Sequence, residues 1–360
     1  MRSVIAPLLA LASLSVFVGC ASADDAASNT SAIESATFLA ADAYADLVVL
    51  GPGSPFGVKA RHAATSSLAG ARWGAHGGPS VTQRGDPGSV LPFGADGVAG
   101  SEVVAARPAD LPALHFWGVD GFVDVPGFAV RAYTTSSAPY AGELLFFGAD
   151  YASVKGRAAV NGYYSGAGIQ GVRGPRIVYS GLSALGASRT APGECALWAA
   201  DLCANGACGT TTKLFDWDGL SGPVAADADG NVFVSAFQPS SGHSDVVYGA
   251  TLREASSTSG ISPTVLGTFD TNGTATFVAA GKGGKGWLLG KGYDGDQPAA
   301  VWAQAYDATS GLHVVGAPLA AALTAATPEV SLTLFADGEG HPWIAADGER
   351  GSAFLELAAK

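Results

Sequence analysis

The stretch "VAADADGNVFVSAF", residues 224–237, places Asp227, Asp229 and a glycine directly before an apolar run. Closely spaced carboxylates suit calcium, but a calcium site needs about six oxygen ligands. The chain becomes apolar immediately after Asn231, so the run of oxygen donors ends too early. Asp and Gly are also the residues that tight turns require. We therefore interpret this stretch as a turn between two strands.

The rest of the chain has no motif that defines a catalytic site. Its six histidines show no metal-ligand spacing, and no nucleophile, zinc-protease or phosphate-loop motif occurs. "GKGGKG", residues 281–286, looks like a phosphate cradle, but a strand-like run follows it instead of the helix N-terminus that would attract an anion. His62, His76, Arg84 and Asp86 share a polar segment without a spacing that fixes their geometry. We predict no catalytic residue, no metal ligand and no cofactor.

An internal repeat defines the elements that must position these residues. Four similar segments begin at glycines that are 56, 54 and 56 residues apart, namely "GPRIVYSGL" at Gly174, "GNVFVSAF" at Gly230, "GKGWLLGKG" at Gly284 and "GHPWIAADG" at Gly340. The strand-like run behind each copy carries a matching aromatic residue, and these are Trp198, Tyr248, Trp302 and Phe354. Weaker copies begin at Gly70 and Gly121.

The repeat unit consists of four short apolar runs, and none of them keeps a helical period. Such a unit is typical of a β-propeller blade. We predict an all-β fold for residues 41–360, a β-propeller of six four-stranded blades; five or seven blades, or a separate N-terminal β domain, are the alternatives. The last copy stops one strand short, so we expect a strand near residues 45–51 to complete the last blade and close the ring.

The repeats resemble the six-bladed propellers of the TolB-like and NHL-like kind found in exported bacterial proteins. The resemblance implies that ligands bind at loops joining the second and third strands, and the outer strand to the next blade. Residues there that could stack on a sugar, form hydrogen bonds or clasp a peptide are Trp217, Asp218, His243, Asp245, Tyr293, Asp294 and Asp296. Solvated turns use the same residue types, so both interpretations stay open.

The N-terminus has the pattern of an export signal. Residues 1–19 contain Arg2 and then an apolar run that is too short to span a bilayer. The run ends in "FVGC", which resembles the lipobox of bacterial lipoproteins and implies a lipid on Cys20; ordinary cleavage after residues 21–23, "ASA", is the alternative. Residues 20–40 then form a tether. The residues after Cys20 resemble an outer-membrane sorting signal.

The remaining cysteines predict a disulfide, and the net charge limits the kinds of partner the protein can bind. Cys203 and Cys208 flank "ANGA", whose Asn-Gly predicts a hairpin turn, so the two thiols face each other and form a disulfide in an oxidising compartment. Cys195 fits a buried strand position. The formal net charge is -12 and no Lys/Arg cluster occurs, which argues against a nucleic-acid partner.

Together these features favour a lipid-anchored cell-envelope propeller that binds or assembles protein or glycan without catalysis. The alternative is an exported propeller enzyme, a hydrolase or lyase acting on saccharides or lactones with a divalent metal in the channel. Carboxylate, Asn or His side chains from several blades that meet at the channel mouth would distinguish the enzyme.

Overall fold

The computed structural model describes residues 37–360 with internal gaps, and this stretch forms one unit, Thr37–Lys360. The residues outside the description are 1–36, 75, 84–88, 95, 105–128, 135–140, 148–152, 162–164, 172–173, 185–194, 202–210, 218–219, 221, 239–243, 253–260, 272 and 293–295. Within the described part, the only helix is a short 3-10 turn, η1 (Ala41–Ala43). No helix there is long and apolar enough to cross a membrane.

The strands form antiparallel sheets in which neighbours in sequence are neighbours in the sheet. Three sheets contain four consecutive strands each: β3 (Ala71–Trp73), β4 (Pro79–Gln83), β5 (Ser89–Pro92) and β6 (Val103–Val104); β10 (Ser165–Gly171), β11 (Gly174–Leu182), β12 (Cys195–Asp201) and β13 (Thr211–Trp217); and β14 (Val224–Ala226), β15 (Asn231–Gln238), β16 (Ser244–Thr251) and β17 (Thr264–Asp270). The repeat therefore corresponds to the sheet, as the sequence predicts.

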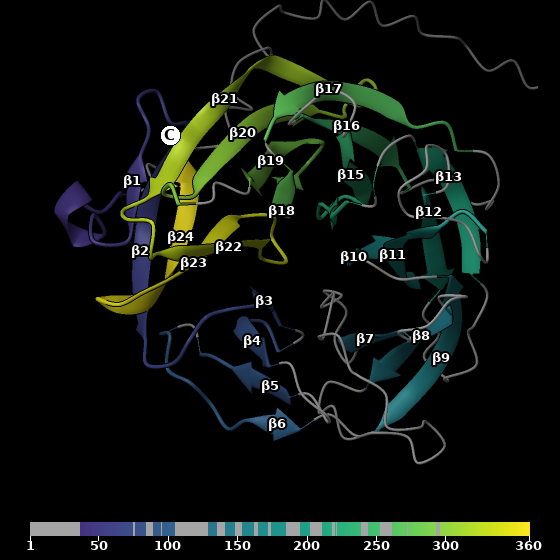
Figure 1. Ribbon diagram of the computed structural model, residues 1–360, viewed down its shortest axis with the longest axis horizontal. Helices are drawn as coiled ribbons and strands as arrows, with labels where there is room; N and C mark the ends of the chain where they lie inside the picture. Colours follow the sequence, from purple (N-terminus) through teal and green to yellow (C-terminus); the bar gives the residue numbers. More distant parts are fainter. Residues whose placement is uncertain are drawn as a thin grey trace, which may run out of the picture. The chain divides into compact units, whose positions relative to one another are not determined.

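Three further sheets differ in the number or origin of their strands. They are the sheet of β7 (Ala129–Thr134), β8 (Ala141–Phe147) and β9 (Val154–Asn161); the sheet of β18 (Thr274–Lys282), β19 (Lys285–Gly292), β20 (Ala300–Asp307), β21 (His313–Ala325) and β1 (Val48–Leu50); and the sheet of β22 (Ser331–Ala336), β23 (Pro342–Gly348), β24 (Gly351–Ala359) and β2 (Phe56–Ala64). Figure 1 shows the sheets around a common centre, with β3, β10, β18 and β22 near it and β13, β17 and β21 toward the rim. The protein is an all-β β-propeller.

The strand that completes the last sheet is β2, and the prediction of residues 45–51 for this role is wrong. β2 pairs with β24 from Phe56 opposite Ala359 to Ala64 opposite Ser352. Residues 45–51 instead supply β1, which pairs with the end of β21 in the neighbouring sheet. β24 and β2 are both nine residues long, whereas the three residues of β1 would leave most of the β24 edge unpaired.

The repeat glycines lie where the first strand of a sheet turns into the second. Left-handed backbone, which glycine adopts without strain, occurs at Gly230 (φ 83°), Gly284 (φ 81°) and Gly340 (φ 81°). Gly77 (φ 82°) precedes β4 in the same way. Gly70 precedes the innermost strand β3, so its assignment as the first copy is wrong, and Gly121 lies outside the described residues.

The core occupies the seams between neighbouring sheets. Between the β14–β17 sheet and the β18–β21 sheet, Phe233, Phe269 and Trp302 belong to one buried cluster. The rings of Phe269 and Trp302 stack with centroids 4.5 Å apart. Burial of each such side chain contributes roughly 1.5–3 kcal/mol, so packing across the seam holds one blade against the next.

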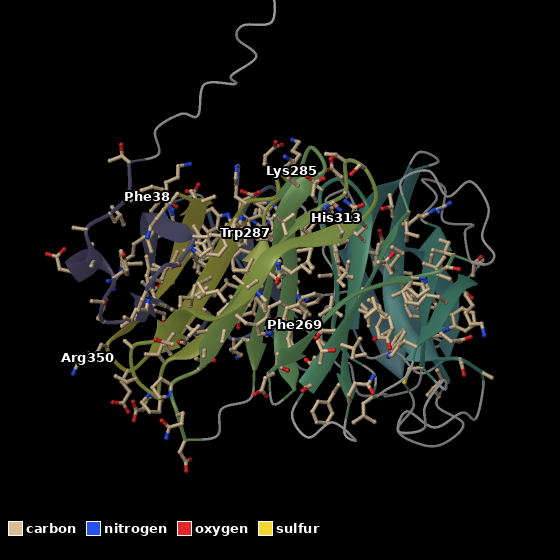
Figure 2. All side chains as sticks on the ribbon, turned by 90° about the horizontal axis from the view of Figure 1, so that it is seen from above. Phe38, Phe269, Lys285, Trp287, His313 and Arg350 are labelled. Carbon is tan, nitrogen blue, oxygen red and sulfur yellow. The ribbon has the colours of Figure 1, made fainter. Side chains whose placement is uncertain are left out.

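The propeller has two ends that differ in the connections they carry. Figure 2 shows Phe38, Lys285 and His313 at one end and Arg350 at the other. We call these the Lys285 end and the Arg350 end. Turns from the first to the second strand lie at the Lys285 end. Connections from the second to the third strand lie at the Arg350 end, because antiparallel strands alternate in direction.

Candidate functional site

At the Lys285 end, both oxygens of the Asp227 carboxylate accept hydrogen bonds from the residue's own turn and from the next blade. Its Oδ1 accepts the backbone amides of Asp229 (3.0 Å) and Asn231 (2.8 Å). Its Oδ2 accepts the side-chain amide of Asn231 (2.7 Å) and the hydroxyl of Tyr306 (2.5 Å). Burial raises the pKa of Asp227, and the donors from Asn231 and Tyr306 oppose that rise. This carboxylate therefore holds structure together and has no lone pair left for a ligand.

Asp337 repeats this arrangement two copies of the repeat further along the chain. Oδ1 accepts the backbone amides of Glu339 and His341, and Oδ2 lies 2.9 Å from Nδ1 of His341 and 3.2 Å from Nε1 of Trp343. In the intermediate copy the corresponding residue is Gly281. The carboxylates of both turns are thus committed to the turns that contain them.

The turns also bind one another across the blades. The amide of Ala228 donates to the carbonyl of Gly281 (3.1 Å), and the amide of Gly284 donates to Oδ2 of Asp229 (2.6 Å). Lys282 forms an ion pair with Glu339. The charged residues at this end therefore connect neighbouring turns.

Only three of the predicted ligand residues, Trp217, Asp245 and Asp296, lie within the described part of the chain. Asp218, His243, Tyr293 and Asp294 lie outside the described residues. Trp217 ends β13 with only 2% of its surface exposed, and its Nε1 points to the carbonyl of Leu220 at 3.4 Å. This tryptophan is a core residue and offers no surface for stacking, contrary to its predicted role. Asp296 is exposed in the turn before β20. Asp245 differs from these residues because its charged side chain is fully buried.

Asp245 is a carboxylate buried in an apolar seam. It lies at the start of β16, opposite Phe237 on one side and Phe269 on the other, and it is 0% exposed. Its Oδ2 accepts the hydroxyl of Ser235 at 2.9 Å. Its Oδ1 has no hydrogen-bond partner among the described residues. A buried carboxylate oxygen without a donor costs several kcal/mol, so this position calls for an explanation beyond packing.

Further polar atoms without partners lie in the same seam, at the Arg350 end. Phe269, opposite Asp245, stacks on Trp302, which packs over Gly290. Buried polar atoms with no partner among the described residues include Nε1 of Trp302 and the hydroxyls of Thr271 and Thr274. Thr274 pairs with Gly292, and the carbonyl of Thr271 covers that same glycine. We define the Asp245 seam as Asp245, Ser235, Phe269, Thr271, Thr274 and Trp302.

The repeat does not require a carboxylate at this position. In the preceding sheet, the residue with the same register is Cys195, which lies opposite Leu182 and Trp217 and is fully buried, as the sequence predicts. The sequence contains the signal for the burial of Asp245. In "SDVVYGAT" it has the same phase as Val247, so strand alternation directs both side chains to one face.

The seam supplies recognition chemistry more readily than catalysis. A single carboxylate can accept a hydrogen bond or pair with a cation, whereas acid–base catalysis commonly needs a second titratable group within reach. Within the described part of the chain, no three His, Cys, Asp or Glu side chains form a group that could hold a metal ion. A channel-bound divalent metal therefore finds no ligand set among those residues.

Two members of the other predicted polar cluster, His62 and His76, contact different partners. His62 on β2 stacks on Trp343 with centroids 5.7 Å apart. Nε2 of His76 lies 3.2 Å from the carbonyl oxygen of Phe93. Arg84 and Asp86, like Cys20, Cys203 and Cys208, are outside the described residues.

The fold is a β-propeller, and its described part contains one buried, partly unpartnered carboxylate between two blades. No protein family matches the sequence, and no curated protein matches it. Similar solved structures include a thermostable family-43 glycoside hydrolase (11% identity, 67% of this chain and 88% of that chain, TM-score 0.38). Others are an uncharacterized protein from Listeria monocytogenes EGD-e (10%, 82% and 79%, 0.38) and a glucose dehydrogenase (10%, 84% and 100%, 0.34). These similarities concern the fold alone.

Proposed function

We propose that the protein is an exported, lipid-anchored β-propeller that acts as a binding or assembly module for a protein or glycan of the cell envelope. The observation that carries this proposal is the contrast between its carboxylates. Asp227 and Asp337 each accept four hydrogen bonds from the fold, whereas Oδ1 of Asp245 is buried and has no partner among the described residues. A glycan hydroxyl or a protein ammonium group that reached this buried oxygen would satisfy it.

We also propose that the propeller has six blades. Six antiparallel sheets occur among the described residues, and the first strands β10, β14, β18, β22 and β3 contact one another in that order. The three-stranded sheet β7–β9 would form the remaining blade, next to β11 and β13, which β9 contacts. In this arrangement β2 closes the ring by joining the two ends of the chain in one sheet.

The position of Phe38 supports an orientation for the anchored protein. Phe38 packs against Gly57 on β2, and the Leu39 amide donates to the carbonyl of Val58 at 2.8 Å. Figure 2 shows Phe38 at the Lys285 end. A lipidated Cys20 would therefore be joined to the propeller at the Lys285 end, opposite the end that carries the Asp245 seam.

Ligand binding at the Asp245 seam is the test of the proposed function. Soluble peptidoglycan fragments, outer-membrane polysaccharide and purified envelope proteins would be titrated calorimetrically against the chain and two variants. Asp245→Asn should weaken binding by about tenfold or more, the loss of one charged hydrogen bond. Glu349→Gln, an exposed carboxylate lost from the same end, should bind as the original chain does.

Two outcomes would contradict the proposal. Unchanged affinity in Asp245→Asn would remove the seam from ligand recognition. Release of reducing ends or opening of a lactone, abolished by a chelator, would favour the enzyme. For the anchor, Cys20→Ala should move the protein from the membrane to the soluble fraction, and retention in the membrane would refute lipidation at this cysteine.

A further inference from the structure

The outer strand β21 carries an unusually uncharged and exposed edge. Its sequence, "HVVGAPLAAALTA", has no Asp, Glu, Lys or Arg, and none occurs from residue 308 to 328. Most of residues 313–320 are exposed, and Val315 has 48% of its surface accessible. An exposed apolar edge strand presents unpaired backbone groups to any other strand that approaches.

Two other outer strands of the propeller, β13 and β2, are protected by charge. β13 carries Lys213 and Asp216, which form an exposed ion pair at 3.1 Å. β2 carries Lys59, paired with Glu356 at 2.8 Å, and Arg61, paired with Asp46 at 2.6 Å. Charged side chains on an edge make pairing with a further strand costly. β21 lacks this protection.

The chain already adds a strand to one part of this edge. β1 pairs antiparallel with residues Leu323 to Ala325, and the amide of Gly51 donates to the carbonyl of Ala322 at 3.0 Å. From His313 to Ala321, no described strand pairs with the outer side of β21. Figure 1 shows β21 curving along the rim beyond β1. The uncovered part thus continues an edge that accepts an antiparallel strand.

We propose that the uncovered part of β21 pairs with the same part of β21 in a second copy of this chain, which gives a two-fold symmetric dimer. The net charge of -12 makes two copies repel each other over most of their surfaces, and repulsion is least where no charged side chain occurs. Antiparallel pairing of identical strands is self-complementary, so the contact closes at two copies. Val265 on the adjacent strand β17, 60% exposed, adds apolar surface beside the pair.

Features of the strand itself limit the contact to a small interface. Gly316 has a left-handed backbone (φ 72°), and Pro318 lacks an amide hydrogen, so the pairing is interrupted there. The uncovered part is about 30 Å long at roughly 3.3 Å per residue. Such a contact is smaller than a standard interface of about 1,200–2,000 Å², so the dimer is weak and depends on concentration.

Sedimentation velocity of the purified chain from about 1 µM to about 1 mM, with hydrogen exchange at both limits, tests the dimer. We expect a rising sedimentation coefficient and slower exchange of the amides from His313 to Ala321 at high concentration. Val315→Lys should weaken dimerisation at least about tenfold, because two like charges would enter one short apolar contact. Val98→Lys, at a 63% exposed position in the connection between β5 and β6, should leave it unchanged.

Each contrary result overturns the proposal. A chain that stays monomeric up to about 1 mM excludes self-pairing and leaves this edge to a different partner. A dimer without protection of β21, or one that Val98→Lys weakens as much as Val315→Lys does, uses another surface. Ligand titrations at the Asp245 seam are independent of these measurements, so the dimer and the proposed binding function fail or stand separately.

Discussion

Tyr306→Phe tests whether the hydrogen bond between blades at Asp227 is charged. Tyr306 is 2% exposed on β20, and its hydroxyl donates to Oδ2 of Asp227, 79 residues earlier in the chain. Burial raises the pKa of Asp227, and the Tyr306 donor lowers it. Loss of the hydroxyl removes a hydrogen bond to a carboxylate without creating a large cavity. We expect unfolding free energy to fall by about 2 kcal/mol where Asp227 is ionised.

The pH dependence follows from the direction of the pKa shift. Because the folded pKa of Asp227 lies above its ordinary 3.8, this group loses stabilisation as pH rises from about 3.8 through the folded pKa. Tyr306→Phe raises that pKa further, so the loss extends to higher pH. A hydrogen bond to the ionised carboxylate contributes about 2 kcal/mol and one to the neutral carboxyl about 1 kcal/mol, so the variant loses more stability where Asp227 is ionised. The destabilisation should therefore grow with pH and then level off.

Tyr179→Phe provides the matched control. Tyr179 is 1% exposed, and its hydroxyl bonds to the neutral side chain of Thr211. Its loss should cost about 1 kcal/mol at every pH below the titration of tyrosine. Urea unfolding of the original chain and both variants between pH 4 and pH 9 gives the three curves. Equal, pH-independent losses in the two variants, or a Tyr306→Phe loss that shrinks as pH rises, would refute the charged hydrogen bond.

Three further predictions concern turns and closure. Gly340→Ala should cost about 2–4 kcal/mol, because the backbone there has φ 81° and the new Cβ would lie 2.5 Å from a backbone carbonyl oxygen of the neighbouring turn. The control Gly53→Ala, with φ 74° and open space around the new Cβ, should cost only about 1 kcal/mol. Equal melting temperatures of the two variants would exclude the close contact at Gly340. Asp347→Ala should cost about 1–2 kcal/mol at pH 7. Burial opposes ionisation of Asp347, but hydroxyl and amide donors lower its pKa. The stabilisation by Asp347 is therefore present above pH 3.8 and disappears as pH falls through the folded pKa. A loss of stability in Asp347→Ala that persists in acid would contradict this prediction. Thiol counting on the denatured, unreduced chain should find Cys203 and Cys208 unreactive, and labelling of either would exclude their disulfide.

Sequence could predict the repeat because its signals are local. A turn from the first to the second strand needs left-handed backbone, and this forces glycine at Gly230, Gly284 and Gly340. The same rule failed near the N-terminus, where Gly70 and Gly77 both adopt left-handed backbone and only one of them follows an innermost strand. Spacing alone cannot distinguish two turns that close together.

The sequence predicts only part of the candidate site. The propeller resemblance places Asp245 in a loop, whereas the alternation of its strand indicates burial beside Val247. Trp217 was misplaced because a strand end and the loop after it look alike in sequence, whereas the fold buries this residue. The role of Asp227 depends on Tyr306, a partner that no local pattern indicates.

By itself, the sequence determined that the chain is all-β and repetitive, and where most of its turns lie, since alternation and glycine placement act over a few residues. Tertiary structure alone decided which strands pair at the closure, which carboxylates the fold saturates, and which outer strand stays uncovered. The physical reason is that these properties depend on groups brought together from distant parts of the chain. Val48 meets Ala325, and Phe56 meets Ala359, only after the sheets have formed.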